Sequence, residues 1–334
     1  MQAAFITAYG LLDKIQVGAQ PKPAPAAGEV LVRMQAASVN PIDYKQVLGE
    51  LKPLIKPAFP LLLGSDGAGV VAELGDGVQA FDIGDEVYFR TPLMQTGSIA
   101  EYISLPAAVL ALKPKNMSFA EAASIPLVGL TAAQALEKAG LKVGSRVLIH
   151  AGAGGVGSFA IQYAKAMGAY VATTASQKRF DMLKTLGADE VVDYRNTRIE
   201  DELADMDIVL DTLGPKVREA SYQTLKKGGT LVSIQGMPDP ETVAHMGANP
   251  IIRIIARMSQ LKHQRIASKH DATFKYYWMR ESGAELDKIS ALIEAGKIRA
   301  VIDSRFPLSD VQAAFARSAS GQAGGKIIVT ISEG

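Results

Sequence analysis

The 334-residue sequence contains no cysteine. Disulfide bonds, thiolate-ligated zinc and a cysteine nucleophile are therefore excluded. The absence of cysteine also fits a reducing compartment. Histidine is scarce as well, and the chain's four histidines do not pair at a metal-ligand spacing such as i, i+4 on a helix. These are His150, His245, His263 and His270. From these absences we expect no metal site.

Long apolar runs and a large net charge are also lacking. No apolar run approaches the ~20 residues that a membrane span needs. The first residues, MQAAFITAYG, lack the basic start of a secretory signal. The formal net charge is +1, so bulk charge favours neither nucleic acid nor a membrane as a partner. We expect a cytoplasmic globular protein.

The pattern of predicted elements changes near residue 120, from strands alone to strands that alternate with helices. Short apolar runs at 30–34, 69–74 and 85–89 predict strands separated by turns, as in a small barrel or sandwich. Ser118 and Glu121 then have the spacing of a helix capping box. From 121 onward strands alternate with helices, which predicts a parallel sheet. Strands are expected at 146–150, 170–174, 190–194, 207–211 and 230–234, with a sixth near 264–268, and helices near 177–186, 215–227 and 250–260.

A glycine-rich turn follows the strand at 146–150. It reads Gly152-Ala153-Gly154-Gly155-Val156-Gly157 and leads into a helical segment. This strand–turn–helix context makes the G-x-G-x-x-G pattern a credible dinucleotide site. Gly152 would form the tight turn, Gly154 would let the backbone approach a pyrophosphate, and Gly157 would let helix and strand pack closely. The helix start would offer N–H groups and partial positive charge to the phosphates.

The C-terminal segment contains helices at about 284–295 and 308–318, an apolar run at 298–303 and a last strand at 326–330. These strands need partners, and rejoining the N-terminal strands is the simplest solution. We therefore expect a Rossmann-type doubly wound domain at 121–270, inserted into a β-rich domain formed by 1–120 and 271–334.

This order resembles the medium-chain dehydrogenase/reductase superfamily over essentially the whole chain, with a GroES-like β-rich catalytic domain. The closest likeness is to the zinc-independent NADPH:quinone oxidoreductase and enone (2-alkenal) reductase branch. The motifs that carry the resemblance, besides the glycine turn, are Ser38-Val39-Asn40-Pro41-Ile42-Asp43-Tyr44-Lys45, Gly64-Ser65-Asp66-Gly67-Ala68-Gly69, Gly97-Ser98-Ile99-Ala100-Glu101-Tyr102, Gly129-Leu130-Thr131-Ala132-Ala133, Glu294-Ala295-Gly296-Lys297-Ile298 and Gly325-Lys326-Ile327-Ile328-Val329.

The resemblance also shows what has been lost. Zinc members of the superfamily have a cysteine at the position of Asn40 and Gly-His-Glu at Gly64-Ser65-Asp66. Their four-cysteine zinc lobe is absent from the segment 89–97. Without a Lewis acid an unactivated alcohol is hard to oxidise, whereas hydride addition to a conjugated C=C needs only hydrogen bonds to the developing enolate. The resemblance therefore implies reduction of a quinone or an α,β-unsaturated carbonyl.

The second strand of the doubly wound domain indicates NADPH as the cofactor. NAD-preferring domains place an acid at its end to bind the ribose 2′-OH. Here the strand runs into Ser176-Gln177-Lys178-Arg179, which offers a hydroxyl and two cations. We interpret Ser176, Lys178 and Arg179 as contacts of the 2′-phosphate. An ordinary solvated helix start is the alternative. By resemblance, Tyr194 packs near the same phosphate.

The remaining site residues come from the resemblance. Asn40, Tyr44 and Lys45 are the candidates that stabilise oxyanion charge, while Thr131 would lie near the nicotinamide. Lys326 would reach the pyrophosphate. Each has a plain alternative: a turn before Pro41 for Asn40, core packing for Tyr44, a surface lysine for Lys45 and a helix cap for Thr131. Asp43 and Asp66 are expected to be structural, as are the clustered aromatics Phe274, Tyr276, Tyr277 and Trp278.

Three other functions stay open at this stage: a non-catalytic, crystallin-like NADPH-binding protein, a zinc alcohol dehydrogenase, which the lost ligands disfavour, and a polyketide-type enoyl reductase module. The resemblance also implies a homodimer, which we place at an edge strand near Gln264–Ser268.

Overall fold

The computed structural model describes residues 1–53, 57–92 and 95–332. The chain divides into two compact units. The first unit comprises Met1–Leu130 and Glu281–Gly334, and the second, Thr131–Arg280, is inserted between these two parts. Both divisions lie ten residues beyond positions 120 and 270, where the sequence pattern suggested them. Each unit has its own buried core of apolar side chains.

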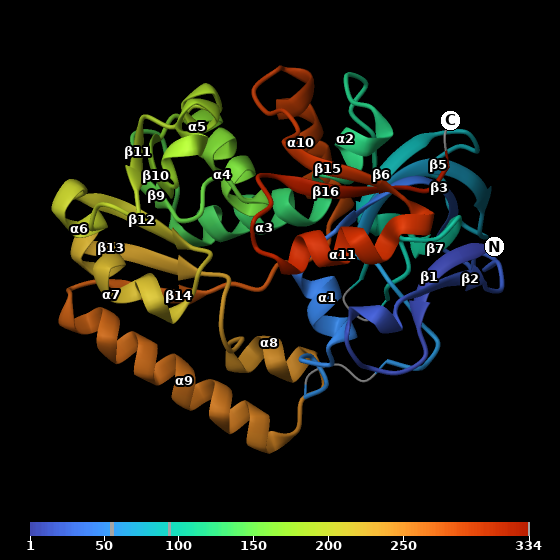
Figure 1. Cartoon of the computed structure of the whole chain (residues 1–334), viewed down its shortest axis with the longest axis horizontal. Helices are drawn as coiled ribbons and strands as arrows, with labels where there is room; N and C mark the ends of the chain where they lie inside the picture. The colour runs from blue at the N-terminus through green and yellow to red at the C-terminus, as the bar shows by residue number, and fades with distance from the viewer. Residues whose placement is uncertain (54–56, 93–94, 333–334) are drawn as a thin grey trace. The chain divides into compact units, whose positions relative to one another are not determined.

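The first unit is built on two sheets, as Figure 1 shows. The larger consists of β3 (Glu29–Val39), β5 (Asp66–Leu74), β6 (Glu86–Arg90), β7 (Tyr102–Pro106), β8 (Leu110–Leu112), β15 (Ile302–Pro307) and β16 (Lys326–Thr330). Its order is β15-β16-β3-β5-β6-β8, with β7 also paired to β3. The smaller sheet has the order β2-β1-β4, from β1 (Gln2–Ile6), β2 (Gln16–Ala19) and β4 (Leu61–Leu62). The predicted strands at 30–34, 69–74 and 85–89 correspond to β3, β5 and β6.

The C-terminal segment joins the N-terminal strands, as expected. Strand β16 pairs antiparallel with β3, with Ile327 opposite Val39, so Lys326 lies beside Asn40. The run at 298–303 is strand only from Ile302 onward. The helices of this unit are α1 (Pro41–Val47), α2 (Phe119–Ala123), α10 (Gly283–Glu294) and α11 (Val311–Ala319), with short 3₁₀ turns η1 (Leu12–Lys14), η2 (Ala107–Val109) and η4 (Leu308–Asp310). The capping box of Ser118 and Glu121 at the start of α2 is confirmed.

The second unit is a parallel six-stranded sheet with the order β11-β10-β9-β12-β13-β14. Its strands are β9 (Arg146–Ile149), β10 (Tyr170–Ala175), β11 (Glu190–Asp193), β12 (Met206–Asp211), β13 (Leu225–Ser233) and β14 (Thr273–Tyr276). The five strands predicted between 146 and 234 are all present. The strand order reverses between β9 and β12, and ligands of such sheets bind at the carboxyl ends of the strands beside this switch point.

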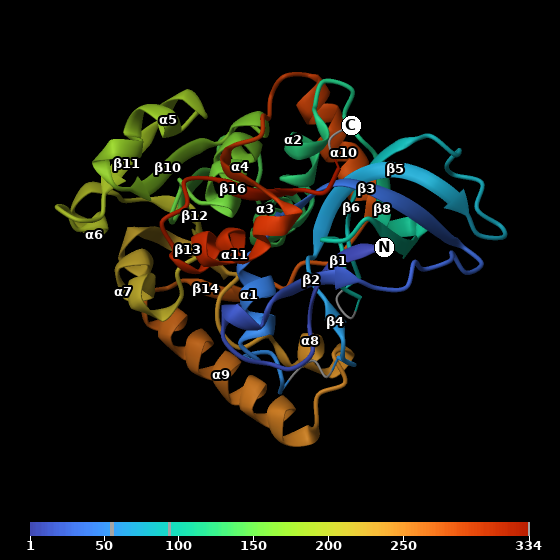
Figure 2. The ribbon, with the colours of Figure 1, turned by 45° about the vertical axis from the view of Figure 1, so that its right-hand side comes forward.

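The helices of the second unit are shown from a second angle in Figure 2. They are α3 (Pro126–Ala139), which begins in the first unit, α4 (Gly155–Ala166), η3 (Gln177–Arg179), α5 (Phe180–Thr185), α6 (Ile199–Glu202), α7 (Pro215–Thr224), α8 (Pro240–His245) and α9 (Pro250–Lys269). Among the described residues, no helix has both the length and the apolar character needed to cross a bilayer.

The prediction of a sixth strand at 264–268 was wrong. These residues continue α9, which runs beside β14 in both views (Figures 1 and 2). Buried Ala256 and Ala267 lie eleven residues apart, three helical turns, so the helical repeat extends through the segment. The sixth strand is β14, where Phe274 and Tyr276 are buried in the core. The dimer edge expected at 264–268 is therefore not a strand.

Candidate functional site

The glycine turn has the geometry that dinucleotide binding requires. Strand β9 ends at Ile149, and α4 begins at Gly155 with Gly154 as its N-cap. A side chain at Gly152 would collide with Thr173 Oγ1, and one at Gly157 would collide with the Ala151 carbonyl. A Cβ at Gly154 would touch only the Ala151 oxygen, at 3.4 Å. Gly152 and Gly157 therefore allow close packing, whereas Gly154 leaves room for a ligand.

The first turn of α4 offers unpaired donors. Gly154 N–H bonds to the Ala151 carbonyl and Ser158 N–H bonds to the Gly154 carbonyl. Within the part of the chain that is described, the N–H groups of Gly155, Val156 and Gly157 have no acceptor. These three amides, together with the positive end of the helix dipole, suit the phosphates of a dinucleotide.

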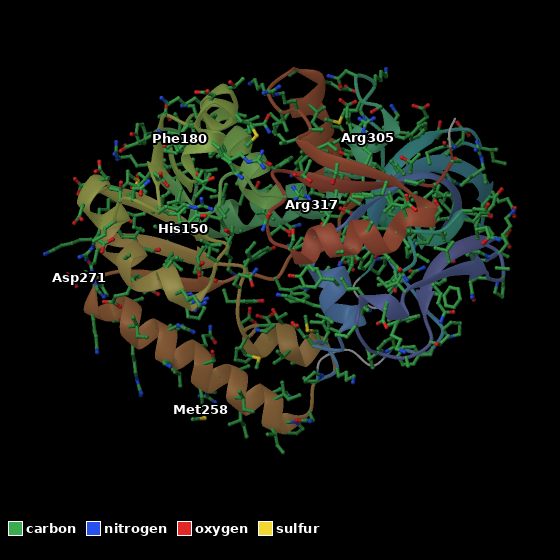
Figure 3. The ribbon with its side chains drawn as sticks, viewed as in Figure 1. His150, Phe180, Met258, Asp271, Arg305 and Arg317 are labelled. Carbon is green, nitrogen blue, oxygen red and sulfur yellow. The ribbon has the colours of Figure 1, made fainter. Side chains whose placement is uncertain are left out.

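His150 is connected to this turn through Thr174. The labelled side chain in Figure 3 lies inside the second unit and is buried. Its Nε2 lies 2.8 Å from Ser221 Oγ and its Nδ1 3.3 Å from Thr174 Oγ1. Burial lowers the pKa of His150 to about 4, so the ring is neutral at pH 7. Thr174 in turn accepts the Ala151 N–H at 3.1 Å, which connects the ring to the turn. In the sequence His150 bears only on the expected absence of a metal site, and nothing there indicates this contact.

Cations gather where β10 and β11 end. The two strands are paired in parallel with Ala175 opposite Asp193, so Ser176 and Tyr194 follow at the same edge. Lys178 is exposed and Arg179 is half-buried. In the described residues, neither forms an ion pair, and the Ser176 side chain makes no capping hydrogen bond.

The structure adds Arg195 to this edge. Its guanidinium lies over the Tyr194 ring at 5.7 Å from the centroid, and its Nε donates to the Tyr194 hydroxyl at 3.4 Å. Tyr194 is 56% exposed, so its ring and the cation beside it are open to solvent. The family resemblance pointed to Tyr194 but not to its neighbour Arg195. The available signal was a third cation directly after the third strand of the domain.

A buried polar cluster forms around Asp66 in the first unit. Asn40 Nδ2 donates to Asp66 Oδ1 at 2.8 Å, and the Ser38 hydroxyl donates to the same oxygen. The Leu127 N–H donates to Asp66 Oδ2 at 3.1 Å. Lys326 Nζ donates to Asn40 Oδ1 and lies 3.9 Å from Asp66 Oδ2. Asn40 therefore has partners for both its amide nitrogen and its oxygen.

Asp43 belongs to the same buried region. It accepts the Asn40 N–H at 2.7 Å and the Ser65 hydroxyl, which fixes the start of α1. Burial raises the pKa of Asp43 to about 6. Buried Arg90 donates to the Thr91 carbonyl and hydroxyl, and it opposes the charges of Asp43 and Asp66. The carboxyl groups of Asp43 and Asp66 thus lie near two basic side chains, Arg90 and Lys326, and all four residues are buried.

The structure gives Asn40 and Lys326 different partners from those expected. The Asn40 amide, predicted to meet a substrate carbonyl, is 1% exposed and bonded to Asp66 and Ser38. Lys326, predicted to reach the pyrophosphate, is 6% exposed, and its amine is used by Asn40. The cause is the antiparallel register of β16 and β3, which brings the first residue of β16 against the end of β3.

Tyr44 and Lys45 follow on α1 and are half-buried. The Tyr44 ring packs against the core of the first unit, as the core-packing alternative expected. Burial also raises the pKa of its hydroxyl, which stays protonated at neutral pH. In the described structure Lys45 Nζ has no acidic partner. Thr131 is buried within α3 at the boundary of the second unit.

The Asp66 cluster does not fit a zinc ion. The Lys326 amine lies 3.9 Å from Asp66 Oδ2 and would repel a metal ion bound beside that carboxylate. Asn40 and Ser65 are weak zinc ligands compared with thiolate or imidazole. Across residues 1–53, 57–92 and 95–332, no group of three or more acidic or histidine side chains could hold a metal ion. Residues 93–94, in the segment expected to lack a zinc lobe, lie outside the described residues.

Comparison with known proteins agrees with this architecture. The Alcohol dehydrogenase GroES-like domain family matches residues 26–115, and the Zinc-binding dehydrogenase family matches residues 186–329. The chain is 35% identical to 2-methylene-furan-3-one reductase of Solanum lycopersicum, over 98% of this chain and 79% of the relative. It is 33% identical to the chloroplastic NADPH-dependent alkenal/one oxidoreductase of Arabidopsis thaliana, over 98% and 79% respectively.

A solved structure shows the same fold over the full length. The quinone oxidoreductase of Coxiella burnetii superposes with a TM-score of 0.84 at 30% identity, covering 99% of each chain. The fold, the glycine turn and these relatives agree. The chain therefore belongs to the medium-chain dehydrogenase/reductase superfamily and is an NAD(P)H-dependent oxidoreductase.

Proposed function

We propose that this protein uses NADPH to reduce the activated double bond of an enone or alkenal, or a quinone. The observation that carries the cofactor assignment is the group of unpaired cations where β10 and β11 end. The substrate class is supported by relatives that are named for quinones and for alkenals or enones. The cluster around Asp66, which does not fit zinc, removes the reason to assign alcohol oxidation.

The adenosine 2′-phosphate explains the cations. It carries roughly −1.5 to −2 charges at pH 7 and accepts several strong hydrogen bonds. Ser176 offers a hydroxyl, Lys178 and Arg179 offer charge, and Arg195 adds a third cation beside Tyr194. The residues directly after β10, 176–180, contain no acid that could bind a free 2′-OH. Gly152, Gly154 and Gly157, with the amides of Gly155 and Val156, would hold the pyrophosphate, and Thr131 would lie by the nicotinamide.

Bound NADPH would supply a hydride to the electrophilic carbon of the substrate. Negative charge then develops on the substrate oxygen, and Lys45 and the Tyr44 hydroxyl are the groups that we propose stabilise it. A proton from water completes the reduction. Asn40 acts as a positioning residue, because its side chain is used by Asp66 and Lys326. Removing a hydrogen bond to a developing charge costs about 2–4 kcal/mol of transition-state stabilisation.

The cofactor assignment is tested by kinetics with both nucleotides. We expect Arg179→Ala and Lys178→Ala to raise KM for NADPH roughly 10–100-fold, since a charged hydrogen bond contributes about 1.5–3 kcal/mol. KM for NADH should hardly change. Lys184→Ala, which removes an exposed cation of α5, is the matched control. A preference for NADH in the native protein would refute the assignment.

The reaction is tested with a panel of quinones, alkenals, enones and alcohols. Turnover of one activated class with NADPH, without added metal, is the expected result. Lys45→Met and Tyr44→Phe should lower kcat with little change in NADPH affinity. Tight NADPH binding without turnover of any compound would instead identify a non-catalytic binding protein. The cytoplasmic location and the homodimer remain predictions.

A further inference from the structure

One surface of the second unit has no role in the proposed reaction. Helix α9 exposes a row of apolar side chains, which we call the α9 stripe. It consists of Ile251, Ile254, Ile255, Met258 and Leu261, which are 68, 60, 47, 66 and 43% exposed. The spacing i, i+3, i+4, i+7, i+10 places them on one side of the helix. Figure 3 shows Met258 on the outer side of α9, away from β14.

The opposite side of α9 accounts for its attachment to the unit. Ala267 and the half-buried Ile266 belong to the core cluster that contains Phe274. His263 stacks on the Phe274 ring with centroids 4.8 Å apart. These contacts hold the C-terminal half of the helix to the sheet. The α9 stripe occupies the N-terminal three turns of the helix and takes no part in these contacts.

The charges of α9 all have one sign. The helix has five cationic residues and no acidic residue over Pro250–Lys269. The cations are Arg253, Arg257, Lys262, Arg265 and Lys269, and all five are exposed. In the described structure none of them forms an ion pair. The overall charge of +1 hides this local excess.

The cations are arranged around the stripe. At 100° per residue, Arg253 and Arg257 border the α9 stripe on one side. Lys262, Arg265 and Lys269 continue the outward face of the helix over its last two turns. An apolar row bordered and extended by Arg and Lys is the pattern of a helix that lies in the plane of a membrane interface.

We propose that α9 docks this protein on an anionic lipid surface, with the α9 stripe among the acyl chains and the cations at the headgroups. Charge complementarity decides between this occupant and a second copy of the chain. Two α9 helices packed through the stripe would bring up to five unpaired cations of each copy together. An anionic bilayer offers both an apolar phase and the opposite charge. The proposal is independent of the proposed reaction.

Vesicle flotation tests the proposal with the full chain. We expect binding to phosphatidylcholine vesicles that contain phosphatidylserine, little binding to phosphatidylcholine alone, and release by salt. Ile254→Gln with Met258→Gln should lower the bound fraction at least fivefold, and Arg253→Gln with Arg257→Gln should lower it on anionic vesicles. The matched controls are Ile83→Gln and Lys216→Gln, which change exposed residues elsewhere and should bind like the native protein.

Two results would overturn the proposal. One is the absence of binding to anionic vesicles, or binding that the stripe variants leave unchanged. The other is a native dimer in solution, measured by light scattering, that Ile254→Gln with Met258→Gln converts to a monomer, because the stripe would then cover a second copy. Circular dichroism and NADPH affinity of each variant show whether the second unit is intact. Loss of vesicle binding in a variant that keeps NADPH affinity cannot be ascribed to unfolding.

Discussion

At the scale of single residues, Gly152 and Gly154 have different roles. Gly152 is needed for packing inside the protein, whereas Gly154 is proposed to be needed for binding the cofactor. A methyl group at Gly152 overlaps Thr173 Oγ1, whereas one at Gly154 is tolerated by the protein. We predict that Gly152→Ala lowers the free energy of unfolding by about 1–3 kcal/mol through overpacking. Gly154→Ala should keep the native stability and weaken NADPH binding at least tenfold. Chemical denaturation and fluorescence titration measure the two effects, and native NADPH affinity in Gly154→Ala would contradict this assignment.

His150 makes stability depend on pH. Its folded-state pKa of about 4 lies below the ordinary value of 6.5, so the unfolded chain binds the proton more tightly. The stabilisation is complete above about pH 6.5 and is lost as the pH falls toward 4, by roughly 3 kcal/mol. His150→Gln lacks this titration. Urea unfolding of both proteins between pH 4 and 7 should show the native protein losing more stability, and parallel curves would show that His150 does not titrate in this range.

Roles that depend on local backbone geometry could be predicted from the sequence, whereas contacts between distant residues could not. Gly152, Gly154 and Gly157 could be assigned because each role follows from a local turn. Lys326 and Asn40 could not, because their contact joins positions 286 residues apart and depends on the register of β16 against β3. Arg195 directly follows the third strand in the sequence, but its nearness to Ser176 becomes visible only when β10 and β11 are paired.

At the scale of elements, buried charge connects α7 to the sheet. Arg218 Nε donates to Asp211 Oδ2 at 2.7 Å, and its Nη2 donates to Ser233 Oγ at 2.9 Å. The Arg218 and Asp211 side chains are both buried. We predict that Arg218→Met lowers the free energy of unfolding by about 3–5 kcal/mol, since it leaves the Asp211 carboxylate without its charge partner. Glu73→Gln, which breaks the exposed pair with Lys22, should change stability little.

Arg218→Met with Asp211→Asn is the second arm of this experiment. The double variant should recover part of the loss, because no unpaired charge remains buried. Equal stability of the single and double variants would show that the charge pair is not what stabilises α7. Urea denaturation followed by circular dichroism measures all of these proteins.

The elements that the sequence misplaced share a physical cause. Each of the strands β9 to β13 contains a short apolar run and is followed by a turn or a helix, so their positions were predictable. Strand β14 has four residues within an aromatic cluster, and α9 has an apolar row facing away from the core. Hydrophobic periodicity is a signal of burial. The exposed apolar row of α9 ends at Leu261, and in 264–268 only Ile266 and Ala267 are apolar and packed on the core, which is too little to show a helical repeat.

At the scale of the whole molecule, each of the two units has buried apolar residues of its own, and the residues proposed to bind the cofactor belong to one unit. The glycine turn, Ser176, Lys178, Arg179, Tyr194 and Thr131 all lie within the second unit, Thr131–Arg280. Lys326, in the first unit, is engaged with Asn40. A ligand stabilises the structure that binds it by about 2.7 kcal/mol at a concentration of 100 times Kd.

We therefore predict that saturating NADPH slows amide hydrogen exchange in strands β9, β10 and β12 about 100-fold, the equivalent of 2.7 kcal/mol, while β3 and β5 of the first unit change little. Mass spectrometry of proteolytic peptides, with and without NADPH, measures this. Arg179→Ala under the same NADPH concentration is the control and should reduce the protection of the second unit. Equal protection of β3 and β5 would show that the two units unfold together, in one cooperative step. Protection confined to the first unit would refute the proposed cofactor site.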